Sequence, residues 1–217
     1  KWLTRANIWV RPEKRLRKCT LARIGRSWVA LIKFNFMNPI AQEYYAKSVG
    51  VVRLTWEDVE HDTLKIIDRM KQDGFEPDII VSIARSGLIP ASLIAYALGN
   101  KQLYVIKVDF SKVQKSGQDQ ELYDRPIITQ ELSVNIQGQK VLVVDEMAVS
   151  GSTLKLVSQY MEIKNPAQVK YAVLYKQPWS QFSPDYFGRE IKEWPLYPWK
   201  ELRNNVIDPR SGIASSK

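Results

Sequence analysis

The chain has 217 residues, of which 45% are hydrophobic and 25% charged, and its net charge is +9. These proportions are typical of globular proteins and exclude a wholly disordered chain, a collagen and a coiled coil, while the length favours one domain with an extension. One cysteine excludes an internal disulfide and fits the reducing cytoplasm, and one histidine excludes an HExxH metal helix. The longest uncharged stretch, residues 86–100, is shorter than the roughly 20 apolar residues that cross a bilayer, so no membrane association is expected.

The positive charge is concentrated at the N-terminus. Residues 1–36 hold ten of the 32 basic residues and one of the 23 acidic ones, so the remainder is neutral. Because Met37 opens a segment of different character, we predict a basic appendage outside the fold over 1–36, a main domain over 37–203 and a polar tail over 204–217. The appendage fits a targeting segment, a basic arm that binds nucleic acid, or sequence upstream of a natural start at Met37, which we favour. Nucleic acid is not an expected partner of the main domain.

From Thr55 onward, helix and strand signals alternate, which is typical of an α/β fold with a parallel sheet. Thr55, followed by Asp58 three residues later, predicts the N-cap of a helix that ends at Gly74. The apolar run 79–84 predicts a buried strand. A second helix is expected over 90–98, where a proline occupies the first position.

Four more strands are expected, over 103–108, 127–132, 140–144 and 169–175, and an amphipathic helix follows the third. The polar stretch 109–126 is too long for a simple connection and favours a lid or binding loop. Aromatic residues and prolines dominate from Pro178 on and predict an irregular C-terminal hood. The fold class is therefore α/β, a doubly wound and mainly parallel sheet flanked by helices.

The most informative junction follows strand 140–144. Asp145 and Glu146 come first, then a small-residue loop that includes Ser150, Ser152 and Thr153, then a helix. A helix N-terminus and hydroxyl groups suit a phosphate, whereas the carboxylates suit ribose hydroxyls or a metal-bound sugar, so together they predict a phosphorylated sugar. An ordinary strand–turn–helix junction with Ser150 as N-cap explains the same residues equally well. The dinucleotide and P-loop motifs are missing.

Several segments resemble type I phosphoribosyltransferases. The run VLVVDEMAVSGSTL over 141–154 is similar to their signature, and IIVSIARSGLIPA over 79–91 looks like their pyrophosphate loop. Lys176 and the run WPLYPW over 194–199 look like their purine-binding end. The likeness covers about residues 52–203 and is greatest to the prokaryotic and archaeal hypoxanthine and xanthine-guanine enzymes.

The resemblance implies transfer of the phosphoribosyl group from 5-phosphoribosyl 1-diphosphate, with Mg²⁺, to a nucleobase, expected to be a 6-oxopurine, in nucleotide salvage. A homo-oligomer is implied as well. The implied roles are ribose binding by Asp145 and Glu146, 5-phosphate binding by Val149, Ser150, Gly151, Ser152 and Thr153, pyrophosphate binding by Arg85, Ser86 and Gly87, and base binding by Lys176 and Trp194. The segment 111–124 would be a mobile loop that closes the site. No residue is assigned as a direct metal ligand.

Four positions depart from the family pattern. Val149 stands where the 6-oxopurine enzymes usually carry an aspartate that contacts N7 and acts as a general base, and Glu146 stands where aspartate is commoner. Ser86 replaces a frequent glycine and Ser152 a frequent lysine. The alternative hypothesis is therefore a catalytically weakened or regulatory relative that binds a nucleotide or phosphoribosyl diphosphate.

Overall fold

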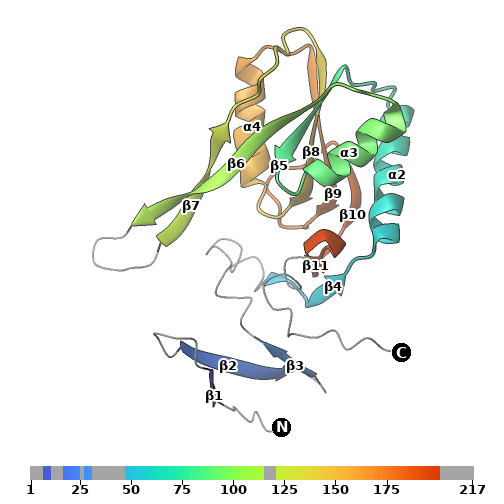
Figure 1. Ribbon diagram of the computed structural model, residues 1–217. Helices are drawn as coiled ribbons and strands as arrows, with labels where there is room; N and C mark the ends of the chain where they lie inside the picture. The colour runs from blue at the N-terminus through green and yellow to red at the C-terminus, as the bar shows by residue number, and fades with distance from the viewer. Residues whose placement is uncertain (1–6, 11–16, 25–26, 31–46, 115–120, 201–217) are drawn as a thin grey trace.

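A six-stranded sheet forms the centre of the molecule. The computed structural model describes residues 7–10, 17–24, 27–30, 47–114 and 121–200 (Figure 1). The strand order is β10-β9-β8-β5-β6-β7, and all neighbours are parallel except the antiparallel pair β6 and β7. The strands are β5 (Ile79–Ala84), β6 (Leu103–Gln114), β7 (Glu121–Gln130), β8 (Lys140–Ala148), β9 (Gln168–Lys176) and β10 (Tyr186–Glu190). The predicted doubly wound, mainly parallel sheet is confirmed.

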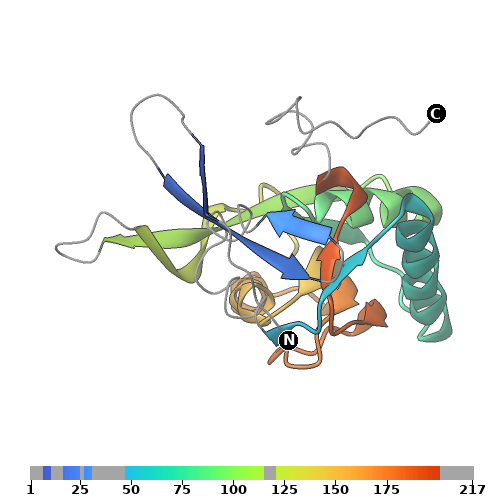
Figure 2. The same cartoon turned by 90° about the horizontal axis from the view of Figure 1, so that it is seen from below.

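Helices cover both faces of this sheet. The helices α2 (Trp56–Gln72) and α3 (Leu88–Leu98) pack on one face, and α4 (Ser152–Ile163) packs on the other (Figure 2). The central strand β8 is apolar on both faces because each face is covered: Leu142 and Val144 lie under α2 and α3, while Val141 and Val143 lie under α4.

The predicted capping of α2 is confirmed. The Thr55 hydroxyl accepts a hydrogen bond from the Asp58 backbone N–H at 3.1 Å, and the Thr55 N–H donates to the Asp58 carboxylate at 2.9 Å. This reciprocal pair satisfies two N–H groups that a helix start otherwise leaves unpaired. The helix ends at Gln72, and Gly74 follows with a φ of 62°.

Two boundary predictions were wrong. The second helix begins at Leu88, so Pro90 is its third residue, which is compatible with a first turn whose N–H groups need no helical partner. The predicted loop over 111–124 is strand where the structure describes it, because β6 runs on to Gln114 and β7 starts at Glu121, while residues 115–120 lie outside the described residues. Figure 1 shows this hairpin projecting from the body, where both of its faces can carry polar residues.

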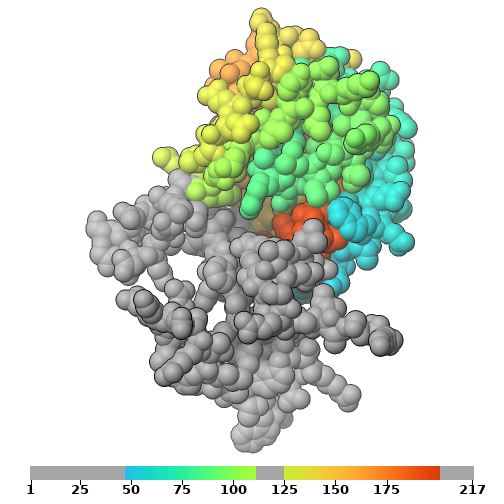
Figure 3. Space-filling view, viewed as in Figure 1, coloured from blue at the N-terminus to red at the C-terminus, as the bar shows by residue number. Residues whose placement is uncertain are grey.

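The C-terminal hood, residues 178–200, was predicted to be irregular and instead supplies two strands. Its first strand, β10, is the edge of the main sheet, parallel to β9. The second, β11 (Trp194–Leu196), pairs in parallel with β4 (Val51–Arg53). Pro195 is accommodated because this short ribbon has free edges. The space-filling view shows the end of the hood in red beside the cyan residues of β4 and early α2 (Figure 3).

The N-terminal residues form a sheet of their own. The strands β1 (Asn7–Val10), β2 (Arg17–Ile24) and β3 (Ser27–Ala30) pair in antiparallel fashion in the order β1-β2-β3. The predicted polar tail over 204–217 lies outside the described residues. Within the described part of the chain, no helix has the length and apolar character needed to cross a membrane.

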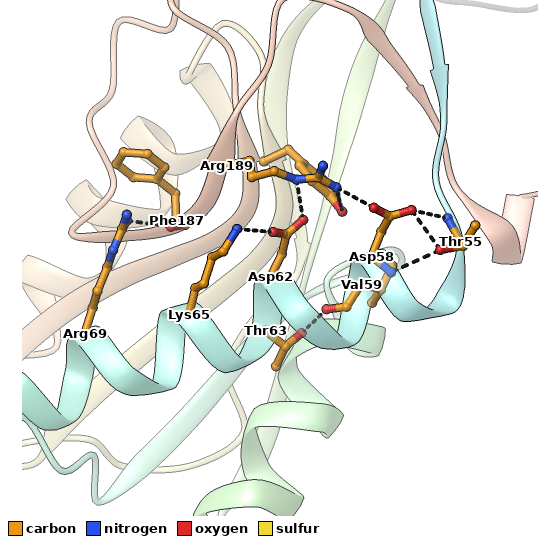
Figure 4. Close-up of polar contacts among 10 residues, drawn as sticks. Thr55, Asp58, Val59, Asp62, Thr63, Lys65, Arg69, Phe187 and Arg189 are labelled. Carbon is orange, nitrogen blue, oxygen red and sulfur yellow. Dashed lines mark hydrogen bonds and ion pairs between the residues drawn. The ribbon is translucent and has the colours of Figure 1, made fainter.

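An ionic cluster ties α2 to the edge strand β10. The Arg189 guanidinium donates through Nε to the fully buried Asp62 carboxylate at 2.7 Å and through Nη2 to Asp58 at 3.1 Å (Figure 4). Lys65 reaches Asp62 as well, at 3.2 Å. The neighbouring Gly188 leaves no room for a side chain, because a Cβ atom there would lie 2.5 Å from the Asp62 Cβ. Helix and strand are therefore held in close contact by charge.

Candidate functional site

The candidate site lies at the carboxyl ends of the neighbouring strands β5 and β8. These parallel neighbours pair from Ile79 with Val141 to Ser82 with Val144, which brings the following loops together. A Cβ atom at Gly87 would lie only 2.7 Å from the Val144 carbonyl oxygen and 3.1 Å from the Asp145 Cα. Only glycine allows the 85–87 loop to approach β8 this closely.

Within the 85–87 loop the three predicted residues differ in exposure. Arg85 is exposed, Ser86 is half-buried and Gly87 is buried. The peptide bond between Ala84 and Arg85 is cis. Arg85 therefore presents its charge to solvent, while Gly87 packs the loop against β8 at Val144 and Asp145.

The acidic pair, Asp145 and Glu146, belongs to the strand itself, since β8 continues to Ala148 rather than ending at Val144 as predicted. Asp145 is 9% exposed, and its Oδ1 accepts the Glu146 N–H at 2.8 Å. Burial, and secondly the charge of Glu146, raise the pKa of the Asp145 carboxyl well above its usual value. Two adjacent carboxylates, one of them poorly solvated, therefore favour a cationic or hydroxyl-bearing ligand.

The 149–153 loop leads from β8 into α4. Gly151 is the N-cap residue with a φ of 82°, so the alternative in which Ser150 caps the helix is wrong. The Ser150 hydroxyl instead accepts the Ser152 N–H at 3.2 Å and lies 2.9 Å from the Ser152 hydroxyl. Hydroxyl groups and the N-terminus of a three-turn helix thus meet beside the acidic pair, an arrangement suited to an anion.

A first prediction concerns protein stability on substitution of Gly151, because a side chain at this position would clash with the backbone of Phe182. A Cβ atom would lie 2.5 Å from the Phe182 N, whereas at Gly138, with a similar φ of 71°, it would meet nothing within 4 Å. We expect Gly138→Ala to cost about 1 kcal/mol of unfolding free energy from the left-handed backbone alone. Gly151→Ala should cost about 1–3 kcal/mol more from overpacking. Urea unfolding of both variants checks this, and equal losses would contradict it.

The two residues predicted to bind a base lie on different strands, Lys176 on β9 and Trp194 on β11. Lys176 ends β9 opposite Ala148 of β8, and its ammonium is 3.4 Å from the Glu190 carboxylate. Trp194 is half-buried in β11, and its backbone N–H donates to the Gly50 carbonyl at 2.9 Å. Gln177, buried directly after Lys176, donates to the Glu193 carbonyl at 3.4 Å and so joins β9 to the hood. Neither of these contacts of Lys176 and Trp194 involves the acidic pair.

Sequence reasoning missed a contact between the hood and the acidic pair. The Lys200 Nζ is 2.7 Å from the Glu146 Oε1, and the Tyr197 hydroxyl donates to the Glu146 carbonyl at 3.5 Å. These residues are more than fifty positions apart from Glu146, and a lysine among aromatic residues carries no motif. Only the return of the chain through β11 brings them to the site.

A second missed group lies at the base of the β6–β7 hairpin. The Asp109 carboxylate is 2.8 Å from the Lys107 Nζ and accepts the Thr129 hydroxyl at 2.7 Å. Lys107 first, then Thr129, hold the pKa of Asp109 below its usual value, and the Arg85 charge adds to this. Because Lys107 pairs with Ala84, the residue before the 85–87 loop, this cluster adds charge beside that loop.

Comparison with known proteins matches the site-bearing part of the chain to one family. Residues 55–202 match the model of the phosphoribosyl transferase domain. The matched region begins at the α2 cap and includes both loops, the acidic pair and the hood.

Relatives agree with this match. The purine phosphoribosyltransferase of Pyrococcus horikoshii is 30% identical with a TM-score of 0.60, over 70% of this chain and 94% of that one. Two curated xanthine-guanine phosphoribosyltransferases are also similar. That of Nitratidesulfovibrio vulgaris is 26% identical over 72% of this chain and 89% of its own, and that of Gluconobacter oxydans is 24% identical over 70% and 86%.

Proposed function

Since the chain belongs to the phosphoribosyl transferase domain family and is a phosphoribosyltransferase, we propose that it transfers the phosphoribosyl group of 5-phosphoribosyl 1-diphosphate to a 6-oxopurine. The C1–oxygen bond to pyrophosphate breaks, a bond from C1 to a base nitrogen forms, and that nitrogen loses its proton. The reaction would serve nucleotide salvage in the cytoplasm. Purine as the acceptor class is supported by the named substrates of the relatives from Pyrococcus horikoshii and Nitratidesulfovibrio vulgaris.

One observation carries the proposal, the packing of Gly87 on β8 at Val144 and Asp145. It brings the 85–87 loop, suited to pyrophosphate, against the acidic pair, suited to ribose hydroxyls, with the 149–153 loop beyond it for the 5-phosphate. A sugar that carries phosphate at both ends would bridge the two loops. The acidic pair would then lie beneath the ribose, where negative charge stabilises positive charge developing at C1.

The acidic pair also fits the chemistry of Mg²⁺, which takes oxygen ligands and is usually held by one or two carboxylates together with substrate phosphates. Among the described residues, no group of three or more His, Cys, Asp or Glu side chains could hold a metal by itself. Asp145 and Glu146 would therefore contribute to a site that the diphosphate completes. Bound there, Mg²⁺ would neutralise charge on the departing pyrophosphate.

The base would lie toward the hood, with Lys176 near its O6 and Trp194 on its ring face, as the family resemblance implies. For Lys176 to reach the base, its ammonium must leave Glu190, which is 45% exposed and offers a weakly held ion pair. We also propose that the protein forms a homo-oligomer, as the family resemblance implies.

A base-panel assay tests the function. The full chain is incubated with phosphoribosyl diphosphate, Mg²⁺ and separately hypoxanthine, guanine, xanthine, adenine or uracil, and nucleotide and pyrophosphate are quantified. We expect equimolar nucleotide and pyrophosphate with at least one 6-oxopurine. Product with uracil alone would overturn the acceptor class, and no product with any base would favour the weakened or regulatory alternative.

Val149 provides a sharper prediction about the base. The half-buried valine at the start of the 149–153 loop cannot accept a proton, whereas an aspartate in this place could. We expect Val149→Asp to raise kcat with 6-oxopurines by about 10²-fold, the lower end of what a positioned general base contributes. Val149→Asn, equal in size but unable to take the proton, should leave kcat near the parent value. Equal gains in both variants would contradict a general-base role at this position.

A further inference from the structure

Glu146 has a partner that no motif assigns. The Lys200 ammonium lies 2.7 Å from one carboxylate oxygen, Oε1, while the side chain of Glu146 is only 18% exposed. Among the described residues this contact is made by Oε1, so Oε2 can accept from a ligand. Lys200 itself is 49% exposed, so its charge can be held in place only if other groups restrain the side chain.

The hood provides that restraint. Lys200 donates its backbone N–H to the Tyr197 carbonyl at 3.0 Å, a turn that places its ammonium 4.6 Å from the centre of the Tyr197 ring. The Tyr197 ring is fully buried, stacked on Trp199 at 4.5 Å and 5.8 Å from the Tyr175 ring. A cation over such a fixed aromatic face is attracted to it, so the Lys200 ammonium is held beside Glu146 before any ligand binds.

The chemistry of Glu146 explains why such a restraint matters. Glutamate has one methylene more than the aspartate common at this place, and the additional torsion lets its carboxylate take more positions. Asp145, directly before it, is fixed by burial and by the Glu146 N–H. Without a partner for Glu146, the two carboxylates would present one fixed and one mobile acceptor to the sugar.

We propose that Lys200 is a positioning residue that fixes the Glu146 carboxylate through Oε1, so that Oε2 faces the ribose hydroxyls of phosphoribosyl diphosphate. The inference rests on the proposed function, since it assigns the ligand of the same site. Lys200 and Glu146 thus form a pair in which the lysine restrains the additional side-chain torsion of the glutamate. An aspartate at 146 would be too short to reach Lys200 and would not need it.

This coupling can be measured by a double-mutant cycle of the full chain. Lys200→Met, Glu146→Asp and the double variant are compared with the parent by calorimetric titration with phosphoribosyl diphosphate and Mg²⁺, and by kcat and KM where turnover occurs. Lys200→Met should weaken binding about 10-fold and act on KM more than on kcat, because misplacing a binding group weakens the contacts it makes. In the Glu146→Asp background the same change should alter binding less than about 2-fold.

Matched controls separate positioning from general charge and from folding. Lys192→Met removes another exposed hood lysine and should leave the Kd unchanged, and Lys200→Arg should restore most of the binding. Thermal unfolding verifies that each variant is folded. Equal effects of Lys200→Met in both backgrounds, or none in either, would overturn the inference. A parent protein that binds phosphoribosyl diphosphate without any turnover would overturn the proposed function alone. The positioning inference would still be tested, because the double-mutant cycle compares binding affinities.

Discussion

Asp145→Asn should reduce kcat/KM for phosphoribosyl transfer by about 10²–10³-fold while making the protein more stable. The loss of activity follows from removing a fixed negative charge beside the carbon at which positive charge develops, since one such preorganised contact typically contributes this much. The gain in stability follows from burial. Asp145 is almost inaccessible to water, so the folded state must desolvate its carboxylate.

The sign of the stability change can be checked against pH. Because burial raises the pKa of Asp145 above its ordinary value of 3.8, the folded state binds its proton more tightly than the unfolded chain does. The aspartate therefore lowers stability as pH rises above about 4, and this penalty is absent where the carboxyl is protonated in both states. We expect the Asn variant to have the higher Tm at pH 7, with a difference that shrinks toward pH 4.

Melting curves across this range, with Asp68→Asn as control, test the prediction. Asp68 is exposed on α2, and its replacement should alter neither Tm nor turnover. A lower Tm for Asp145→Asn at pH 7 would show that the carboxylate is stabilised by its surroundings. Full activity of that variant would remove Asp145 from the proposed site.

Arg189→Met should destabilise the fold by about 3 kcal/mol, toward the lower end of the range for breaking a buried ion pair. The reason is the charge left behind, since Asp62 has no exposed surface and its remaining ion pair among the described residues is with Lys65, which is itself 37% exposed. Arg189 is 35% exposed, which places the expected effect below that of a fully buried partner. For a chain of this size the corresponding fall in Tm is about 6–12 °C.

A double variant isolates the cause. Asp62→Asn removes the buried charge, so Arg189→Met should cost much less in that background than alone, a coupling that urea unfolding measures. Lys164→Met is the control, because its pair with Glu131 is 3.6 Å long and largely exposed and should contribute at most about 0.5 kcal/mol. Additive losses in the double variant would mean that Arg189 acts by packing rather than by charge.

The sequence was sufficient to predict those parts of the structure that depend on residues close to one another in the chain. The Thr55–Asp58 box, the apolar strand from Val141 and the order of helices and strands from α2 to β9 were predicted, because capping and burial on both faces of a sheet act over a few residues. The motif at 141–154 also identified the strand that carries the acidic pair, although this strand extends beyond the predicted end.

Signals that depend on tertiary surroundings were misread. The polar residues 111–124 were taken for a loop, although β6 runs on to Gln114 and β7 starts at Glu121, and a paired edge hairpin can contain polar residues. The proline and aromatic content of the hood concealed β10, whose place at the edge of the sheet is fixed by Gly188 and Arg189 against α2.

The sequence by itself therefore determined the fold class, the family resemblance and the two loops proposed to bind a phosphorylated sugar, since each of these depends on short contiguous runs of residues. Only the tertiary structure decided that Asp145 is desolvated and that Lys200 holds Glu146. Both properties arise from segments far apart in the chain, because solvent exclusion and charge pairing depend on distance in space rather than on order in sequence.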